Sequence, residues 1–233
     1  MKKITKLASV ALLLTSVTST AFADNWNIGA SASYGNIDGT ASDTQLDSRT
    51  STTVAQTRGA NGGDADFPFA SIFIEYAKTM DKDLDIIIGL DYVPFKAEID
   101  SKSFADTSLE AATTGTGTRK AKLELENYAT LYLQPTYKIG GGTAVFGKVG
   151  YIHGDVKISG SNTATGSTIN ATDTLNGYVV GLGVQHNINK NVFVRLEGSY
   201  TDHDSVTATD SKSTKFTADS EIIAGKLSIG YSF

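Results

Sequence analysis

Nine charged residues alternate with apolar residues along the chain, and they are the first candidates for chemistry. They are Glu75, Asp85, Asp91, Glu124, Glu126, Lys148, Arg195, Glu197 and Lys226. Successive side chains of a β-strand point to opposite faces, so the charges would share one face and the apolar residues the other. If the strands closed into a barrel, the charges could line a selective path for small ions. The alternative, which we expect, is that opposite charges pair and fill the lumen, because a small barrel is only just wide enough for its own side chains.

A histidine between two carboxylates, in Asp202-His203-Asp204, is the second candidate, because carboxylates can orient a general base. No second acidic pair is recognisable at another strand end, so we expect His203 to be a solvated loop residue. His153 and Asp155 are interpreted in the same way. Three scattered histidines and no cysteine do not make a metal site. With no Gly-x-Ser-x-Gly motif either, the sequence predicts a protein that is not an enzyme and needs no cofactor.

The charge balance and the amino terminus indicate where the protein works. The formal net charge of −5 becomes −8 without Lys2, Lys3 and Lys6, and an acidic protein is a poor partner for nucleic acid. These lysines precede an apolar segment, 7–17, and the small-x-small sequence Ala21-Phe22-Ala23. This is the layout of a secretory signal peptide, so we expect residues 1–23 to be cleaved and residues 24–233 to form the folded domain. An uncleaved anchor is the rival interpretation.

Eight segments carry the alternation that would position the charged residues. Their ranges are 26–36, 68–77, 84–92, 123–137, 145–151, 178–185, 192–200 and 226–233. A tilted strand of roughly this length crosses the hydrocarbon layer of a membrane. The sequence therefore predicts an all-β fold, a closed antiparallel transmembrane barrel. We expect eight strands, or ten if the first long connection holds a hairpin.

The connections between these segments alternate strictly between short and long. The short ones are 78–83, 139–142 and 187–191, and the long ones are 37–67, 97–121, 154–176 and 201–220. Short periplasmic turns and long external loops are typical of outer-membrane barrels, whereas a soluble β-sandwich has no reason to sort its loops in this way. The long connections are rich in Ser, Thr, Ala, Asp and Gly, as in 41–63 and 160–174. They would form either a recognition surface or a solvated fringe with little order.

The carboxy-terminal segment has an apolar face that ends in an aromatic residue. Leu227, Ile229, Tyr231 and Phe233 form this face, and small or polar residues form the other. This segment, with 145–151, 177–186 and 191–200, resembles the small outer-membrane barrels of the OmpA-like and opacity-protein type.

The resemblance implies an exported multi-pass barrel in the outer membrane of a Gram-negative bacterium, in contact with lipid and lipopolysaccharide. It also implies that the closing strand is an assembly signal for the barrel-assembly machinery. The expected role is structural or adhesin-like, with loops that could bind an extracellular ligand; the alternative is a narrow porin-like channel. No peptidoglycan-binding domain follows Phe233 in this sequence, so we expect a stand-alone barrel.

Overall fold

The computed structural model describes residues 25–45, 56–58, 63–107, 116–163, 166–209 and 215–233. The predicted signal peptide lies outside the described residues. The strands are β1 (Asn25–Gln45), β2 (Gln56–Arg58), β3 (Gly63–Asp81), β4 (Leu84–Tyr92), β5 (Ala97–Thr107), β6 (Thr116–Gly140), β7 (Thr143–Asn162), β8 (Ser167–Asn187), β9 (Val192–Thr209) and β10 (Lys215–Ser232). The described part of the chain contains no helix that is long and apolar enough to span a membrane.

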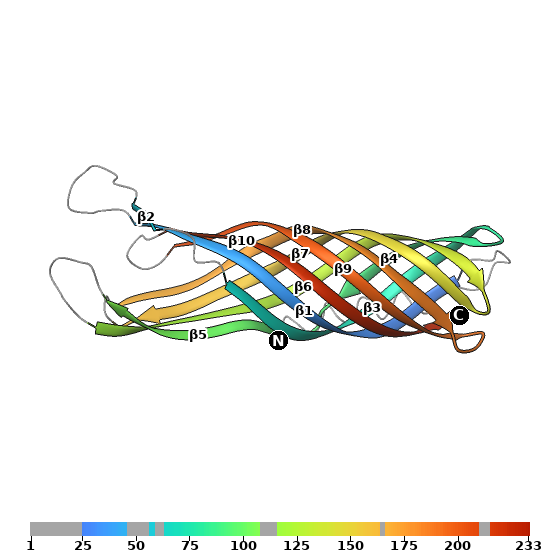
Figure 1. The fold of residues 1–233 in the computed structure, drawn as a ribbon, viewed down its shortest axis with the longest axis horizontal. Coiled ribbons are helices and arrows are strands. Elements are labelled where there is room, and N and C mark those ends of the chain that lie inside the picture. The colour runs from blue at the N-terminus through green and yellow to red at the C-terminus, as the bar shows by residue number, and fades with distance from the viewer. Residues whose placement is uncertain (1–24, 46–55, 59–62, 108–115, 164–165, 210–214) are drawn as a thin grey trace, which may run out of the picture.

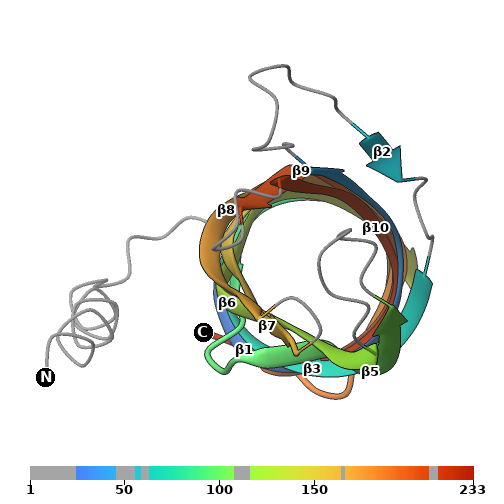
Figure 2. The same cartoon turned by 90° about the vertical axis from the view of Figure 1, so that its left-hand side faces the viewer.

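The strands close into an antiparallel barrel (Figures 1 and 2). Each strand pairs with its neighbours in the order β10-β9-β8-β7-β6-β4-β3-β1, and β1 pairs with β10. Strands β4 and β5 follow one another along the same edge of β6, so together they form one member of an eight-stranded barrel. The short β2 pairs with the outer end of β1, at Asp43–Gln45. The prediction of eight strands is therefore confirmed, and β2 adds no strand to the wall.

The short connections are turns at one end of the barrel. The turn between β6 and β7 needs glycine, because Gly140, Gly141 and Gly142 have φ values of 97°, 60° and 75°, which side chains disfavour. At the opposite, outer end, the strands run much further than the sequence predicted. For example, β7 extends to Asn162 and β8 begins at Ser167, so most of the expected loop 154–176 is strand.

These outer extensions are stabilised by apolar side chains that face inward. Val156, Leu175 and Val206 are buried there with Phe67 and Ile222 in one hydrophobic cluster. The prediction that these segments were loops was wrong because their outward residues are mostly Ser, Thr and Asp, which hid the inward alternation of apolar residues.

Outward aromatic side chains mark the two ends of the apolar outer belt. Near the turns, Trp26 and Tyr76 lie 5.3 Å apart between ring centroids. At the outer end, Tyr151 and Tyr178 lie 5.4 Å apart. Tyr34, Tyr92 and Tyr200 are further outward aromatics at the outer end. Aromatic girdles at two levels are typical of barrels that sit in a bilayer, with the polar strand extensions outside it.

A bulge at Asn127 reverses the inward and outward faces of β6. Asn127 has a φ of 52°, and the register with β7 shifts between Glu126 and Ala129. Beyond the bulge Leu125 is buried inside the barrel. Because neighbouring residues alternate, Glu124 and Glu126 face outward. The prediction that these two carboxylates line the lumen was therefore wrong.

Four inward aromatic rings each lie over a glycine directly opposite on the neighbouring strand. The pairs are Phe73 with Gly29, Tyr132 with Gly89, Phe146 with Gly183, and Phe193 with Gly230. A Cβ atom on any of these glycines would lie 2.2–2.3 Å from the ring. The glycines thus let the rings lie flat against the wall, which leaves the centre of the lumen to the charged side chains.

Deleting Phe233 is expected to impair assembly. Its amide donates to the Trp26 carbonyl at 3.0 Å and its carbonyl accepts from the Trp26 amide at 3.1 Å, so it closes the ring between the first and last strands. We expect less folded protein in outer-membrane fractions, measured by heat-modifiable gel mobility. A Phe233→Tyr variant keeps the backbone pair and serves as the control. Normal insertion of the truncated protein would contradict the role of this residue.

Candidate functional site

The lumen is closed by a layer of ion pairs whose centre is Arg195 with Glu75. Both side chains are almost fully buried, with residue exposures of 3% and 1%. The guanidinium donates two parallel hydrogen bonds to the carboxylate, Nη1 to Oε1 and Nη2 to Oε2, the second at 2.8 Å. Strands β9 and β3, which carry them, are separated by β10 and β1, so the pair reaches across the interior. Two-point pairing of this kind is the strongest geometry available to these groups.

Neighbouring polar side chains make further hydrogen bonds to this pair. The Tyr132 hydroxyl donates to Glu75 Oε1 at 2.5 Å, and the Asn27 amide donates to Oε2 at 3.1 Å. Arg195 Nε donates to the Gln185 side-chain oxygen at 2.7 Å. The guanidinium also lies 4.5 Å from the centroid of the Phe193 ring. A buried ion pair is tolerated when its hydrogen bonds are completed in this way.

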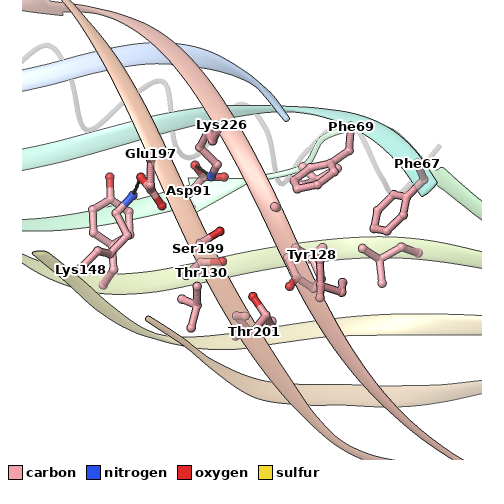
Figure 3. Close-up of a pocket in the computed structure, with 17 residues that line it drawn as sticks. Phe67, Phe69, Asp91, Tyr128, Thr130, Lys148, Glu197, Ser199, Thr201 and Lys226 are labelled. Carbon is pink, nitrogen blue, oxygen red and sulfur yellow. Dashed lines mark hydrogen bonds and ion pairs between the residues drawn. The ribbon is translucent and has the colours of Figure 1, made fainter. Parts of the chain in front are cut away.

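Two further pairs complete the ion-pair layer. Lys148 Nζ lies 2.5 Å from Glu197 Oε2, and Lys226 Nζ lies 2.9 Å from Asp91 Oδ2 (Figure 3). The Lys148 ammonium is also 4.4 Å from the centroid of the Tyr132 ring. Each of the three cations of the layer therefore has its own carboxylate, and the layer is neutral.

The structure thus brings six of the nine charged candidates together and separates the other three. Asp85 faces inward near the turns, where it accepts from Lys138 at 2.9 Å and from Thr79 at 2.8 Å. Glu126 and Glu124 lie on the outer surface, in ion pairs with Lys96 at 2.5 Å and Lys122 at 3.2 Å. The remaining six form the ion-pair layer.

Sequence reasoning missed three inward residues of this interior, Tyr132, Asn27 and Lys138. The alternation of the sequence could have identified Tyr132, because it is two residues from Gln134, which is also buried in the lumen, and so lies on the same face of β6.

His203 is buried inside the barrel, with an exposure of 6%, and the expectation that it is a solvated loop residue was wrong. Its Nε2 lies 3.2 Å from the Tyr128 hydroxyl and its Nδ1 lies 3.2 Å from Ser220 Oγ. Asp202 and Asp204 are exposed on the opposite face of β9, so neither carboxylate orients the imidazole. Among the described residues no group of three or more His, Asp and Glu side chains could hold a metal ion.

A cavity lies between the ion-pair layer and the apolar cluster of the outer end (Figure 3). About 50 Å³ of it is open to the centres of water molecules. At ~10–15 Å³ per water, this is room for roughly four water molecules. Lys226, Asp91, Lys148 and Glu197 form its charged floor, and apolar side chains of the outer cluster form its upper wall.

The geometry defines a class of protein: a transmembrane β-barrel whose lumen is closed by a layer of its own side chains. Residues 8–220 match the family described as the outer membrane protein beta-barrel domain. The chain belongs to this family, and it is an outer-membrane protein. The predicted fold, location and resemblance to small outer-membrane barrels are confirmed.

The chain is similar to several solved structures of outer-membrane proteins, and it shares its fold with the first of those that follow. OprG from Pseudomonas aeruginosa is 17% identical, covering 91% of this chain and 97% of its own, with a TM-score of 0.54. The protease OmpT from Escherichia coli is 12% identical, covering 94% and 100%, with a TM-score of 0.49. The attachment invasion locus protein Ail of Yersinia pestis is 15% identical, covering 88% and 98%, with a TM-score of 0.41. The comparison with curated proteins gives no match.

Proposed function

We propose that this protein is a non-enzymatic barrel that acts at the outer surface of the cell, by presenting its extended strands to an extracellular ligand. The observation that carries this proposal is the closed lumen, in which an ion-pair layer and an apolar cluster follow one another along the barrel axis. A lumen closed by the ion-pair layer leaves the exposed outer strands as the largest surface available to an extracellular ligand.

The outer strands form an ordered platform for such an interaction. Strand β7 continues beyond Tyr151, which is in the outer aromatic girdle, as far as Asn162. At ~3.3 Å per residue this is roughly 35 Å along the strand. The inward apolar cluster holds the extension together, so its outward Ser, Thr and Asp side chains are displayed on a rigid support.

Other contacts belong to the same proposal. The apolar belt and its aromatic girdles would contact lipid and lipopolysaccharide. The closing strand, through Leu227, Ile229, Tyr231 and Phe233, would be recognised by the barrel-assembly machinery after removal of the signal peptide, residues 1–23. Its acidic net charge is unfavourable for binding nucleic acid.

Single-channel recording tests the closed lumen. We expect residues 24–233, refolded into a planar bilayer, to give no discrete currents, because an ion would have to displace a paired buried charge. Folded insertion is verified by gel mobility and protease protection. Discrete currents that change in a Lys148→Met variant would overturn the proposal in favour of a narrow channel.

A shortened β7–β8 hairpin tests the surface role. Replacing residues 158–171 by Asn-Gly joins Lys157 to Thr172, which are paired in the structure. We expect cells that display this variant to lose binding to a panel of immobilised polysaccharides and extracellular-matrix proteins, with the barrel still folded. The double variant Glu75→Met, Arg195→Met, altered only in the lumen and without an unpaired buried charge, should bind like the wild type. If the wild type and both variants bind no better than cells that lack the protein, a surface role is contradicted.

A further inference from the structure

The barrel wall is interrupted beside the outer cavity. Pairing between β3 and β4 ends at Ile72 with Tyr92, and no backbone pair between the described residues links Gly63–Ser71 of β3 to β5. The chain between β4 and β5 contains Pro94, which has no amide hydrogen to donate to β3. Just before it, the Val93 amide donates to the Tyr128 carbonyl at 2.9 Å, so the chain stays on the β6 side. We call the unpaired stretch between Gly63–Ser71 and β5 the seam.

The seam leads to the cavity. Phe67 and Phe69 are on β3 at the seam, Val93 is on its other side, and all three line the cavity. The rings of Phe67 and Phe69 stack with centroids 5.5 Å apart. Phe67 is buried in the outer cluster together with Ala97, the first residue of β5. Side chains, without backbone hydrogen bonds, therefore close the wall here, and a side chain can move without breaking the sheet.

The base of the seam lies at the level of the outer aromatic girdle. Tyr92 continues the outward row of Ile88 and Leu90, which face the lipid. Three residues further on, Phe95 is 73% exposed. An exposed aromatic side chain at this level is suited to the boundary between hydrocarbon and head groups. The seam thus faces the part of the membrane where small apolar molecules with a polar end accumulate.

We propose that the outer cavity is a binding site for a small, uncharged, mainly apolar molecule with one hydroxyl group, and that the ligand enters through the seam. Below the cavity the ion-pair layer closes the lumen, and above it Val156, Leu175 and Val206 are packed together. The remaining route is through the seam, where only side chains close the wall. This site is separate from the surface role proposed above.

The chemistry of the cavity selects this class of ligand. Phe67, Phe69, Val93, Leu125 and Ile222 offer an apolar wall, which favours an aromatic or alkyl body. Thr130, Ser199 and Thr201 bring hydroxyl groups that can exchange hydrogen bonds with a ligand hydroxyl (Figure 3). A charged ligand is disfavoured, because each charge of the floor already has its partner and an added ion would be buried unpaired.

Fluorescence quenching by 4-bromophenol tests the site. The chain has a single tryptophan, Trp26, far from the cavity, so a Trp26→Phe, Phe69→Trp variant has one reporter in the cavity wall. In lipid nanodiscs we expect saturable quenching of this reporter. The matched control carries Trp26→Phe with Leu182→Trp, where residue 182 is 75% exposed toward lipid. Its quenching should rise linearly with the amount of partitioned probe.

A variant in which a larger side chain fills the cavity distinguishes binding of 4-bromophenol in the cavity from its partitioning into the lipid. Adding Ala224→Phe, or independently Val93→Phe, to the Phe69→Trp reporter should abolish saturation, with folding checked by circular dichroism. Linear quenching of the cavity reporter, equal to that of the Leu182→Trp control, would overturn the binding site.

The rate of association tests the route. In stopped-flow quenching we expect Phe67→Ala to raise the association rate several-fold, because it removes the largest of the buried side chains that close the seam. Val206→Ala loosens the apolar packing at the outer end and should leave the rate unchanged. The reverse pattern, an increase with Val206→Ala alone, would overturn the entrance through the seam and show access from the outer end.

Discussion

Replacing Glu75 with alanine is expected to lower the free energy of unfolding by about 3–5 kcal/mol, the typical cost of removing one partner from a buried ion pair. Arg195 would remain buried without its carboxylate, and the Tyr132 and Asn27 donors would lose their acceptor. Urea titration of the protein in lipid vesicles, followed by Trp26 fluorescence, measures the loss.

Two controls separate the buried charge from a general effect of mutation. Asp85→Ala removes a carboxylate paired with Lys138, whose side chain is 42% exposed, so the expected loss is within about 1 kcal/mol. The double variant Glu75→Met, Arg195→Met removes both charges and should recover much of the stability lost by Glu75→Ala. If Glu75→Ala unfolds at the same urea concentration as the wild type, the ion-pair layer is not what fills the lumen.

The second large effect is expected from Gly183→Ala. A Cβ atom at this position would lie 2.3 Å from Phe146 Cζ and 2.4 Å from the Leu196 carbonyl oxygen, so both the ring and the neighbouring backbone would have to shift. We expect a loss of about 3 kcal/mol, at the upper end of what overpacking usually costs. The same urea titration in vesicles measures it.

Gly198→Ala is the matched control for this prediction. Gly198 lies on the adjacent strand, opposite Leu182, and a Cβ atom there meets no atom within 4 Å. Its expected effect is within about 0.5 kcal/mol. Equal effects of the two substitutions would mean that the rings do not need the glycines beneath them. In that case the Phe146 ring would have another position available in the lumen.

Most of the membrane-embedded part of the fold could be predicted from the sequence, because each strand there separates lipid-facing apolar side chains from polar ones. The alternation of apolar and polar residues no longer identifies strands outside the membrane, where the outer face of the barrel meets water and not lipid. Outside the girdles both faces of the wall meet water or a small apolar interior, so the strand character of 154–176 was hidden. At Asn127 a single bulge reverses the faces of β6, so that Leu125 points inward and Glu126 outward. The alternation of apolar and polar residues does not show where such a bulge lies.

The composition of the candidate site was partly predictable, but its pairing was not. The alternation within each strand was sufficient to place three cations in the lumen: Lys148, Arg195 and Lys226. Their partners depend on the tilt and stagger of the closed barrel, which bring Arg195 of β9 to Glu75 of β3. The burial of His203 required knowledge that β9 continues beyond Tyr200, and the seam required knowledge of where β3 and β4 stop pairing.

The pairing of β1 with β10 has a consequence for the time course of folding. It runs from Asn27 with Ser232 to Thr44 with Lys215 without a shift of register, and its paired residues are between 171 and 205 positions apart in the sequence. Contacts of such high contact order form late and slowly. Until they form, two long strands with unpaired amide and carbonyl groups are open to other chains. A periplasmic chaperone that shields these edges would therefore matter most for this protein in the interval before the ring closes.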